Sequence, residues 1–235
     1  MATIDQIVGI AIDDTNNLVF AWFTDGTVTA GSSKDLSSKR PGEKYKLPQG
    51  KNPSDIVGMG IDGTNNLVFA WYQDGTVSAG TSRDLSAKRP PQRYTLPTGK
   101  SPSDIVGMGI DGKNDLVFAW YRDGTVSAGS SRELGSKRPP QPYQLAEGKT
   151  PADVIELGID GLAAEKVLSN LVDLAGDALG LGNDDDEGGG LSDTLKGIFK
   201  GTTKSLVFAW YRDGTVSAGS SKALAIVRPG SAFAT

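Results

Sequence analysis

Acidic residues recur at one position of a repeated pattern in this sequence. Asp13, Asp62, Asp111 and Asp160 each end a run of alternating bulky and small residues. If these runs lie innermost in the fold, the four carboxylates would ring one mouth of a central channel. Such an all-oxygen set is what Ca²⁺ or Mg²⁺ prefers in proteins. Glu156, which replaces a glycine of the other three runs, has the same strand parity and would strengthen the ring. Aspartate before Gly or Asn is also ordinary turn chemistry, so both interpretations stay open.

A second candidate site lies in a basic loop that is present in three copies. Arg40, Arg89 and Arg138 each follow a lysine, and an acid stands upstream at Asp35, Asp84 and Glu133. The planar guanidinium offers several fixed donors for the hydroxyl groups of a sugar. The same arginines could instead pair with the acid of their own loop. In the fourth copy, Val227 and Ala223 replace the lysine and the acid, so only three intact sites are expected.

The sequence segments that would position these residues are repeated four times. LVFAWYRDGTVSAGSS at 116–131 recurs unchanged at 206–221, and near copies begin at residues 18 and 67. In the second copy, 54–62 and the apolar run 67–72 predict two strands, and Asp74-Gly75 predicts a tight hairpin turn into a third strand at 76–82. A polar loop then leads to a short fourth strand at 93–97. Four short antiparallel strands in a unit of about 49 residues are typical of a propeller blade.

The repeats therefore predict an all-β, four-bladed β-propeller. At fold level the pattern resembles hemopexin-like propellers and the tectonin-type lectin propellers that are built from near-identical blades. This resemblance implies multivalent carbohydrate binding, with the faces of Trp22, Trp71 and Trp120 stacking on sugar. Burial of these tryptophans between blades is the alternative, because each lies inside an apolar strand.

The fourth copy begins 41 residues later than a fourth period would place it. We therefore expect the chain to divide into three segments. Residues 1–161 form the first three blades and the first strand of the fourth, 162–202 form an insertion, and 203–235 form the remainder of the fourth blade. Apolar periodicity in the insertion predicts a helical hairpin. Its docking face would carry the residues Leu168, Leu171, Leu179, Leu195 and Phe199. This hairpin could pack on the propeller, dock a protein partner or a second copy of the chain, or lie on a membrane.

Composition removes several classes of function. The 235 residues include no Cys and no His, so thiol chemistry and the commonest general base and metal ligand are absent. A formal net charge of −4 gives no global attraction to nucleic acid. With no apolar leader visible, we expect a cytoplasmic protein, or one exported by another route. The function expected is a non-enzymatic, lectin-like binding protein without a cofactor other than the channel cation. The alternative is an interaction scaffold whose inserted helices dock to a partner.

Overall fold

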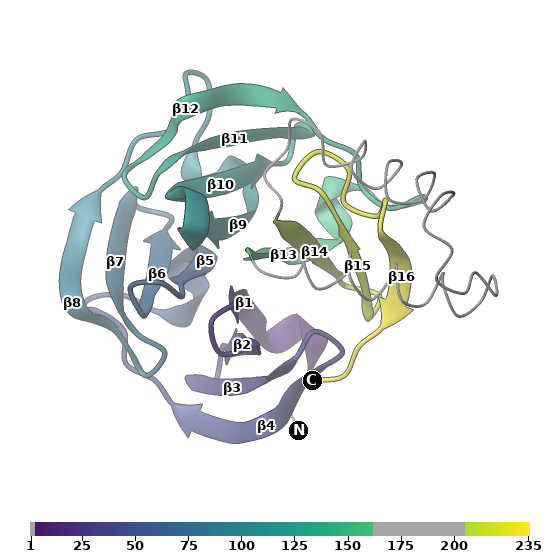
Figure 1. Cartoon of the computed structure of the whole chain (residues 1–235). Helices are drawn as coiled ribbons and strands as arrows, with labels where there is room; N and C mark the ends of the chain where they lie inside the picture. The colour runs from purple at the N-terminus through teal and green to yellow at the C-terminus, as the bar shows by residue number, and fades with distance from the viewer. Residues whose placement is uncertain (1–2, 162–204) are drawn as a thin grey trace, which may run out of the picture.

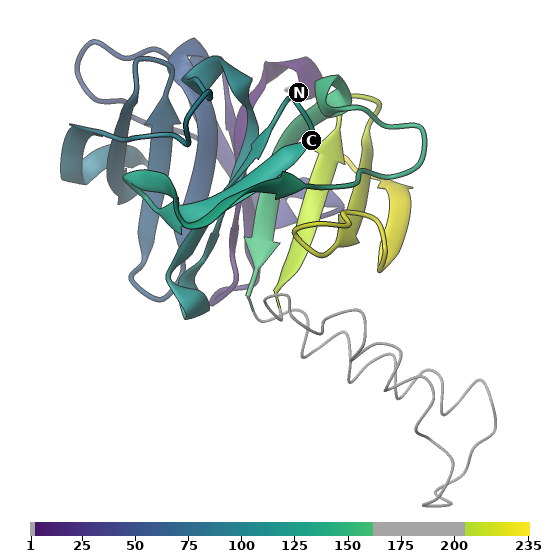
Figure 2. The ribbon, with the colours of Figure 1, turned by 90° about the horizontal axis from the view of Figure 1, so that it is seen from above.

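The computed structural model describes residues 3–161 and 205–235, which form four separate sheets around one axis (Figure 1). Each sheet has four strands in chain order, and every pair of neighbouring strands is antiparallel. The inner strands run from one face of the ring to the other, as the second view shows (Figure 2). The prediction of an all-β, four-bladed propeller is confirmed.

The strands and short helices have the following bounds. Blade 1 contains β1 (Ile7–Asp13), β2 (Leu18–Phe23), β3 (Thr27–Ser32) and β4 (Asp35–Lys44). Blade 2 contains β5 (Ile56–Asp62), β6 (Leu67–Tyr72), β7 (Thr76–Thr81) and β8 (Asp84–Arg93). Blade 3 contains β9 (Ile105–Asp111), β10 (Leu116–Tyr121), β11 (Thr125–Ser130) and β12 (Glu133–Pro142). Blade 4 contains β13 (Val154–Asp160), β14 (Leu206–Tyr211), β15 (Thr215–Gly219) and β16 (Arg228–Ala232). Single 3₁₀ turns are η1 (Ile4–Gln6), η2 (Pro53–Asp55), η3 (Pro102–Asp104), η4 (Gly112–Asn114) and η5 (Pro151–Asp153).

The first strand of each blade lines the axis. β1, β5, β9 and β13 each contact the two neighbouring inner strands. Side chains fill the axis, because Ile10, Met59, Met108 and Leu157 are completely buried there. The next layer along the axis, which includes Ile61 and Ile110, leaves no room for a water molecule. The axis is therefore a packed core rather than an open channel.

The repeated tryptophans lock each blade to the next. Trp22, Trp71 and Trp120 are completely buried, and each indole N–H donates to a backbone carbonyl of the following blade, at Ser82, Ser131 and Ser221 respectively. The donor–acceptor distances are 3.0, 2.9 and 3.1 Å. Trp210 makes the matching bond to the carbonyl of Ser33 in blade 1. The ring faces are thus inaccessible to a ligand, and the packing alternative replaces the expectation of sugar stacking.

The outer strand corrects one boundary of the sequence analysis. The basic stretch expected to be a polar loop forms the edge strand itself, β8 in blade 2. The segment expected as the fourth strand, 93–97, contributes Arg93 to the end of β8 and a bridge at Thr95. The register between β7 and β8 shifts twice, and one of the two irregularities contains Pro90 and Pro91. Proline and positive charge are both tolerated on such an edge, because one side of the strand has no partner.

Short bridges close the ring. The segment after each outer strand pairs with the next blade, as Lys46 does with Asp84. At the end of the chain, the Ala234 N–H donates to the Lys34 carbonyl at 2.8 Å, and its own carbonyl accepts from Leu36 at 3.0 Å. Blade 4 is therefore fastened to blade 1 by the carboxyl-terminal segment, as in Figure 1.

The interruption of the fourth repeat lies between β13 and β14, where Asp160 still pairs with Leu206. The predicted helical hairpin at 162–202, with Leu168, Leu171, Leu179, Leu195 and Phe199, lies outside the described residues, so that prediction and its domain boundaries stay predictions. Among the residues that the structure does describe, none of the helices has the length and apolarity needed to cross a membrane.

Candidate binding cavity on the propeller axis

Glu156 closes the axis near one face of the propeller. The residue is 2% exposed, and its carboxyl group accepts three backbone N–H groups from three different inner-strand positions. Oε1 accepts from Met108 at 2.8 Å and from Leu157 at 3.1 Å, and Oε2 accepts from Met59 at 3.3 Å. Burial raises the pKa of Glu156 well above its usual range, and the three N–H groups oppose this shift.

The neighbouring inner strands leave space for this one side chain because they carry glycine. A Cβ on Gly107 would lie 2.7 Å from Oε1 of Glu156 and 2.4 Å from Cδ1 of Leu157. No side chain can occupy that position while the glutamate is present. The sequence alone marked Glu156 as unusual, but grouped it with the aspartates. The structure instead places it at the other end of β13, bonded to backbone.

A cavity of about 430 Å³ lies above Glu156, on the face where the inner strands begin. Its walls come from the first residues of β5, β9 and β13, such as Val57 and Val106, and from the 3₁₀ turns η2, η3 and η5. The charged residues among the described residues that line it are Glu156, Arg122 and Arg212. Cavities of this volume are common binding sites for small ligands or inserted side chains.

Both arginines lie at the position that varies in an otherwise repeated hairpin. Thr24, Gln73, Arg122 and Arg212 each follow the apolar strand and precede Asp-Gly. Arg122 and Arg212 are exposed, and Nε of Arg212 donates to the Ala152 carbonyl at 3.3 Å, which holds that side chain over η5. Sequence reasoning missed these residues, although a comparison of the four copies marks the position.

The opposite mouth carries the predicted acidic ring, and the expectation of a metal site there is not met. Asp13, Asp62 and Asp111 each turn back onto their own loop, where they accept both the backbone and the side-chain N–H groups of an asparagine three residues later. Asp160 closes β13 at the same mouth. Within residues 3–161 and 205–235, no group of three or more acidic side chains is placed to hold a metal ion. The carboxylates of Asp13, Asp62 and Asp111 are bonded within turns, as the second interpretation proposed.

One further acid crosses this mouth. Asp14 stands where the other copies have glycine, and its Oδ2 accepts the N–H of Gly161 from blade 4 at 3.2 Å. Burial is the largest cause that raises the pKa of Asp14, and the neighbouring Asp160 charge adds to it. The side chain therefore links blade 1 to blade 4 directly after the end of β13.

The arginines of the basic loop stack on aromatic rings. The guanidinium carbons of Arg40, Arg89 and Arg138 lie 5.9, 5.8 and 5.8 Å from the ring centres of Phe20, Phe69 and Phe118 respectively. The carboxylates of the loop acids Asp35 and Asp84 accept N–H groups from serines two residues later. At the third loop acid, Glu133, the backbone N–H donates to Oγ of Ser130. The crevice beside Arg89 has a volume of about 20 Å³, room for about one water molecule. The sugar-binding role of this loop stays a prediction.

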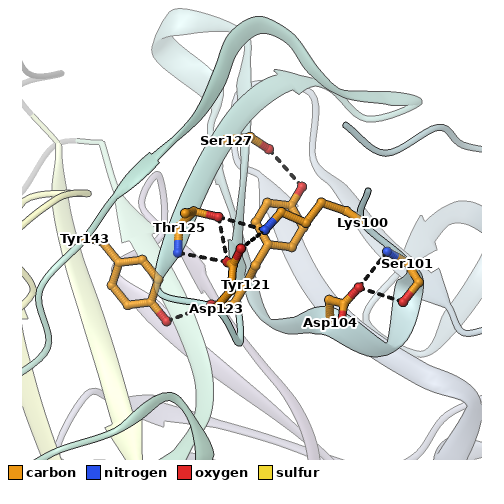
Figure 3. A network of polar contacts seen from close by, with 8 residues as sticks. All are labelled: Lys100, Ser101, Asp104, Tyr121, Asp123, Thr125, Ser127 and Tyr143. Atoms are coloured by element: carbon orange, nitrogen blue, oxygen red, sulfur yellow. Dashed lines mark hydrogen bonds and ion pairs between the residues drawn. The ribbon is translucent and has the colours of Figure 1, made fainter. Parts of the chain in front are cut away.

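A polar network holds each hairpin turn in place (Figure 3). In blade 3, Lys100 forms an ion pair with Asp123, whose Oδ1 accepts from the N–H and hydroxyl of Thr125 at 3.1 and 2.7 Å. Its ammonium nitrogen also lies 4.8 Å from the ring centre of Tyr121. The hydrogen bond from Lys100 lowers the pKa of Asp123. Lys51 and Lys149 repeat the arrangement in blades 2 and 4, so it is a structural feature of these three blades.

Comparisons with known proteins do not assign this chain to a family. No family model matches the chain, and no curated protein matches it. Similar solved structures include the WD40 β-propeller domain of Doa1 (13% identity, TM-score 0.36, covering 57% of this chain and 40% of that one). A second is U3-55K, with 9% identity and a TM-score of 0.35, covering 91% of this chain and 48% of that one. A third is the RRP9 WD40 repeats, with 8% identity and a TM-score of 0.35, covering 91% of this chain and 47% of that one. This chain thus spans less than half the length of those chains.

Similarity this low carries no argument about function. The four sheets described above establish the fold by themselves. The comparisons give no support to the lectin resemblance of the hemopexin or tectonin type, nor to a glycan partner.

Proposed function

We propose that this protein is a non-enzymatic binding scaffold that holds an acidic side chain of a protein partner in the axial cavity, between Arg122 and Arg212. The observation that supports the proposal is the charge of the lining. Two exposed guanidinium groups stand at the rim, and the one carboxyl group in the lining is buried and bonded to three backbone N–H groups. An anion therefore meets two unneutralised positive charges on entering.

Three acids on the turns around the mouth are engaged with their own turns rather than with these arginines. Asp55, Asp104 and Asp153 each accept the backbone N–H of the residue three positions earlier, at 2.7, 2.8 and 2.7 Å, and lie outside the cavity lining. They close the small turns η2, η3 and η5. The rim between them is formed by small exposed residues such as Ser54, Ser103 and Ala152, which let a partner's backbone approach closely.

The test is the anisotropy of a fluorescein-labelled Gly-Ser peptide with a central Glu-Glu-Glu, compared with the same peptide carrying Gln-Gln-Gln. The glutamate peptide is expected to bind and the glutamine peptide is not. The double variant Arg122→Ala/Arg212→Ala should weaken binding at least about tenfold, because a charge-assisted hydrogen bond contributes roughly 1.5–3 kcal/mol.

A matched control removes the same charge elsewhere. Arg93 and Arg132 are exposed on the outer rim of the propeller, and the variant Arg93→Ala/Arg132→Ala should bind as the wild type does. Equal binding of the two peptides, or equal losses in the two double variants, would show general electrostatic attraction and refute the proposal.

A further inference from the structure

We infer that the axial cavity takes up one proton on Glu156 when it binds the partner's carboxylate, so that acidification tightens binding at this site. The inference rests on the proposed function and concerns its regulation. Glu156 forms the floor of the same cavity whose rim carries Arg122 and Arg212. A carboxylate entering from the rim therefore approaches a second carboxyl group along the axis.

The surroundings of Glu156 leave it without a cation of its own. β5 and β9 present backbone N–H groups to it, β14 places Trp210 opposite it in register, and β1 contributes the glycine Gly9 at the equivalent position. Among the described residues, the charged groups that face the cavity are the two rim arginines. Oε2 has a single N–H partner, Met59 at 3.3 Å, so this oxygen is the one free to hold a proton.

Burial favours the protonated form, since it raises the pKa of Glu156. A bound anion adds a negative charge in the same enclosed space and raises this pKa further. Linkage makes the effect reciprocal, so protonation of Glu156 strengthens anion binding by the same factor. The carboxyls of Asp104 and Asp153, on the turns beside the mouth, have lowered pKa values because of hydrogen bonds from Ser101 and Thr150, and so keep their charge at neutral and mildly acidic pH.

The acids Asp13, Asp14, Asp62, Asp111 and Asp160 lie at the opposite mouth. The packed residues Met59, Met108 and Leu157 and the layer beyond them separate these acids from Glu156. These acids therefore belong to the far face of the propeller and do not line the cavity.

The experiment measures the affinity of the same glutamate peptide from about pH 5.5 to 8, where the peptide's own carboxylates stay ionised. The wild type is expected to bind more tightly as pH falls, with a slope of at most about tenfold per pH unit. Calorimetry in two buffers of different ionisation enthalpy should show uptake of up to one proton. In Glu156→Gln the affinity should be independent of pH, and no proton should be taken up.

A second variant covers the case in which Glu156→Gln does not fold. Glu156→Gly restores the residue that the other three repeats carry, and it should also bind without pH dependence. Wild-type affinity that is constant across this range, or pH dependence that survives in either folded variant, would overturn the inference while the proposed function stands. No binding at any pH would refute the proposed function itself.

Discussion

Replacement of Glu156 by Gln is expected to remove a pH dependence from the stability of the propeller. Burial raises the pKa of Glu156 in the folded protein, whereas the unfolded chain titrates near the ordinary value of about 4.3. Between these two values, the folded state holds one proton that the unfolded state has released. Stability is therefore greatest below the unfolded pKa and falls as pH rises toward the folded one.

The size of the effect follows from linkage. One proton of difference corresponds to about 1.4 kcal/mol of unfolding free energy per pH unit. Relative to Glu156→Gln, the wild type should lose up to about this amount for each pH unit between about pH 4.3 and the folded pKa of Glu156. Guanidinium-induced unfolding, followed by the fluorescence of the four buried tryptophans, measures both proteins at each pH.

The difference between the two proteins isolates Glu156, because all other titrating groups are common to both. The aspartates of the hairpin turns, such as Asp123 and Asp213, have lowered pKa values through their lysine partners. Their contribution is lost only as pH falls below about 4. A difference in unfolding free energy that stays constant over the range, or that grows in favour of the wild type with rising pH, would refute the reasoning.

Three further results are expected. Lys100→Met removes the ion pair with Asp123 and the contact with the Tyr121 ring, and should lower the unfolding free energy by about 1 kcal/mol in urea titrations, whereas Lys88→Met on the exposed edge should not. Trp120→Phe loses an inter-blade hydrogen bond and ring volume, which should cost about 2 kcal/mol and lower the thermal midpoint. Exchange of 162–205 for Thr-Asn-Asn, the turn of blade 2, should leave the fold and the glutamate-peptide affinity unchanged. Loss of peptide binding in this last variant would instead assign docking to the insertion.

The fold was largely predictable because the same pattern of strands and turns recurs four times in the sequence. The Asp-Gly pairs marked the hairpins correctly, and Gly75 has the positive φ of +80° that such a turn requires. The apolar runs marked strands buried on both faces. The outer strand was not predictable from pattern alone, since its lysines and prolines are typical of a loop. Only its place at an edge, where half of the backbone groups need no partner, allows such residues in a strand.

The candidate site could be predicted only in part. Strand parity gave the face on which Glu156 lies, but not its depth along the axis. Asp160 lies four positions further along the strand, which is about 13 Å at the usual rise per residue. The residues that the four copies share did not indicate the rim arginines, because Arg122 and Arg212 stand at a position where the copies differ. In this propeller the shared tryptophans, tyrosines and lysines are committed to structure.

The geometry of the axis also fixes how many ligands the cavity can hold. A Cβ on Gly9 would lie 2.3 Å from Cγ of Met59, and one on Gly107 would lie 2.7 Å from Glu156 Oε1. The four equivalent positions therefore cannot all carry side chains without displacing their neighbours, which disfavours a fourfold set of sites on the axis. The axial cavity should bind one carboxylate-bearing segment per chain, and titration calorimetry should give a stoichiometry of one. Sites at the basic loops would instead give three, because Arg40, Arg89 and Arg138 stand on separate blades with the intact loop sequence. A measured value of three that survives Arg122→Ala/Arg212→Ala would move the binding function from the axis to the rim.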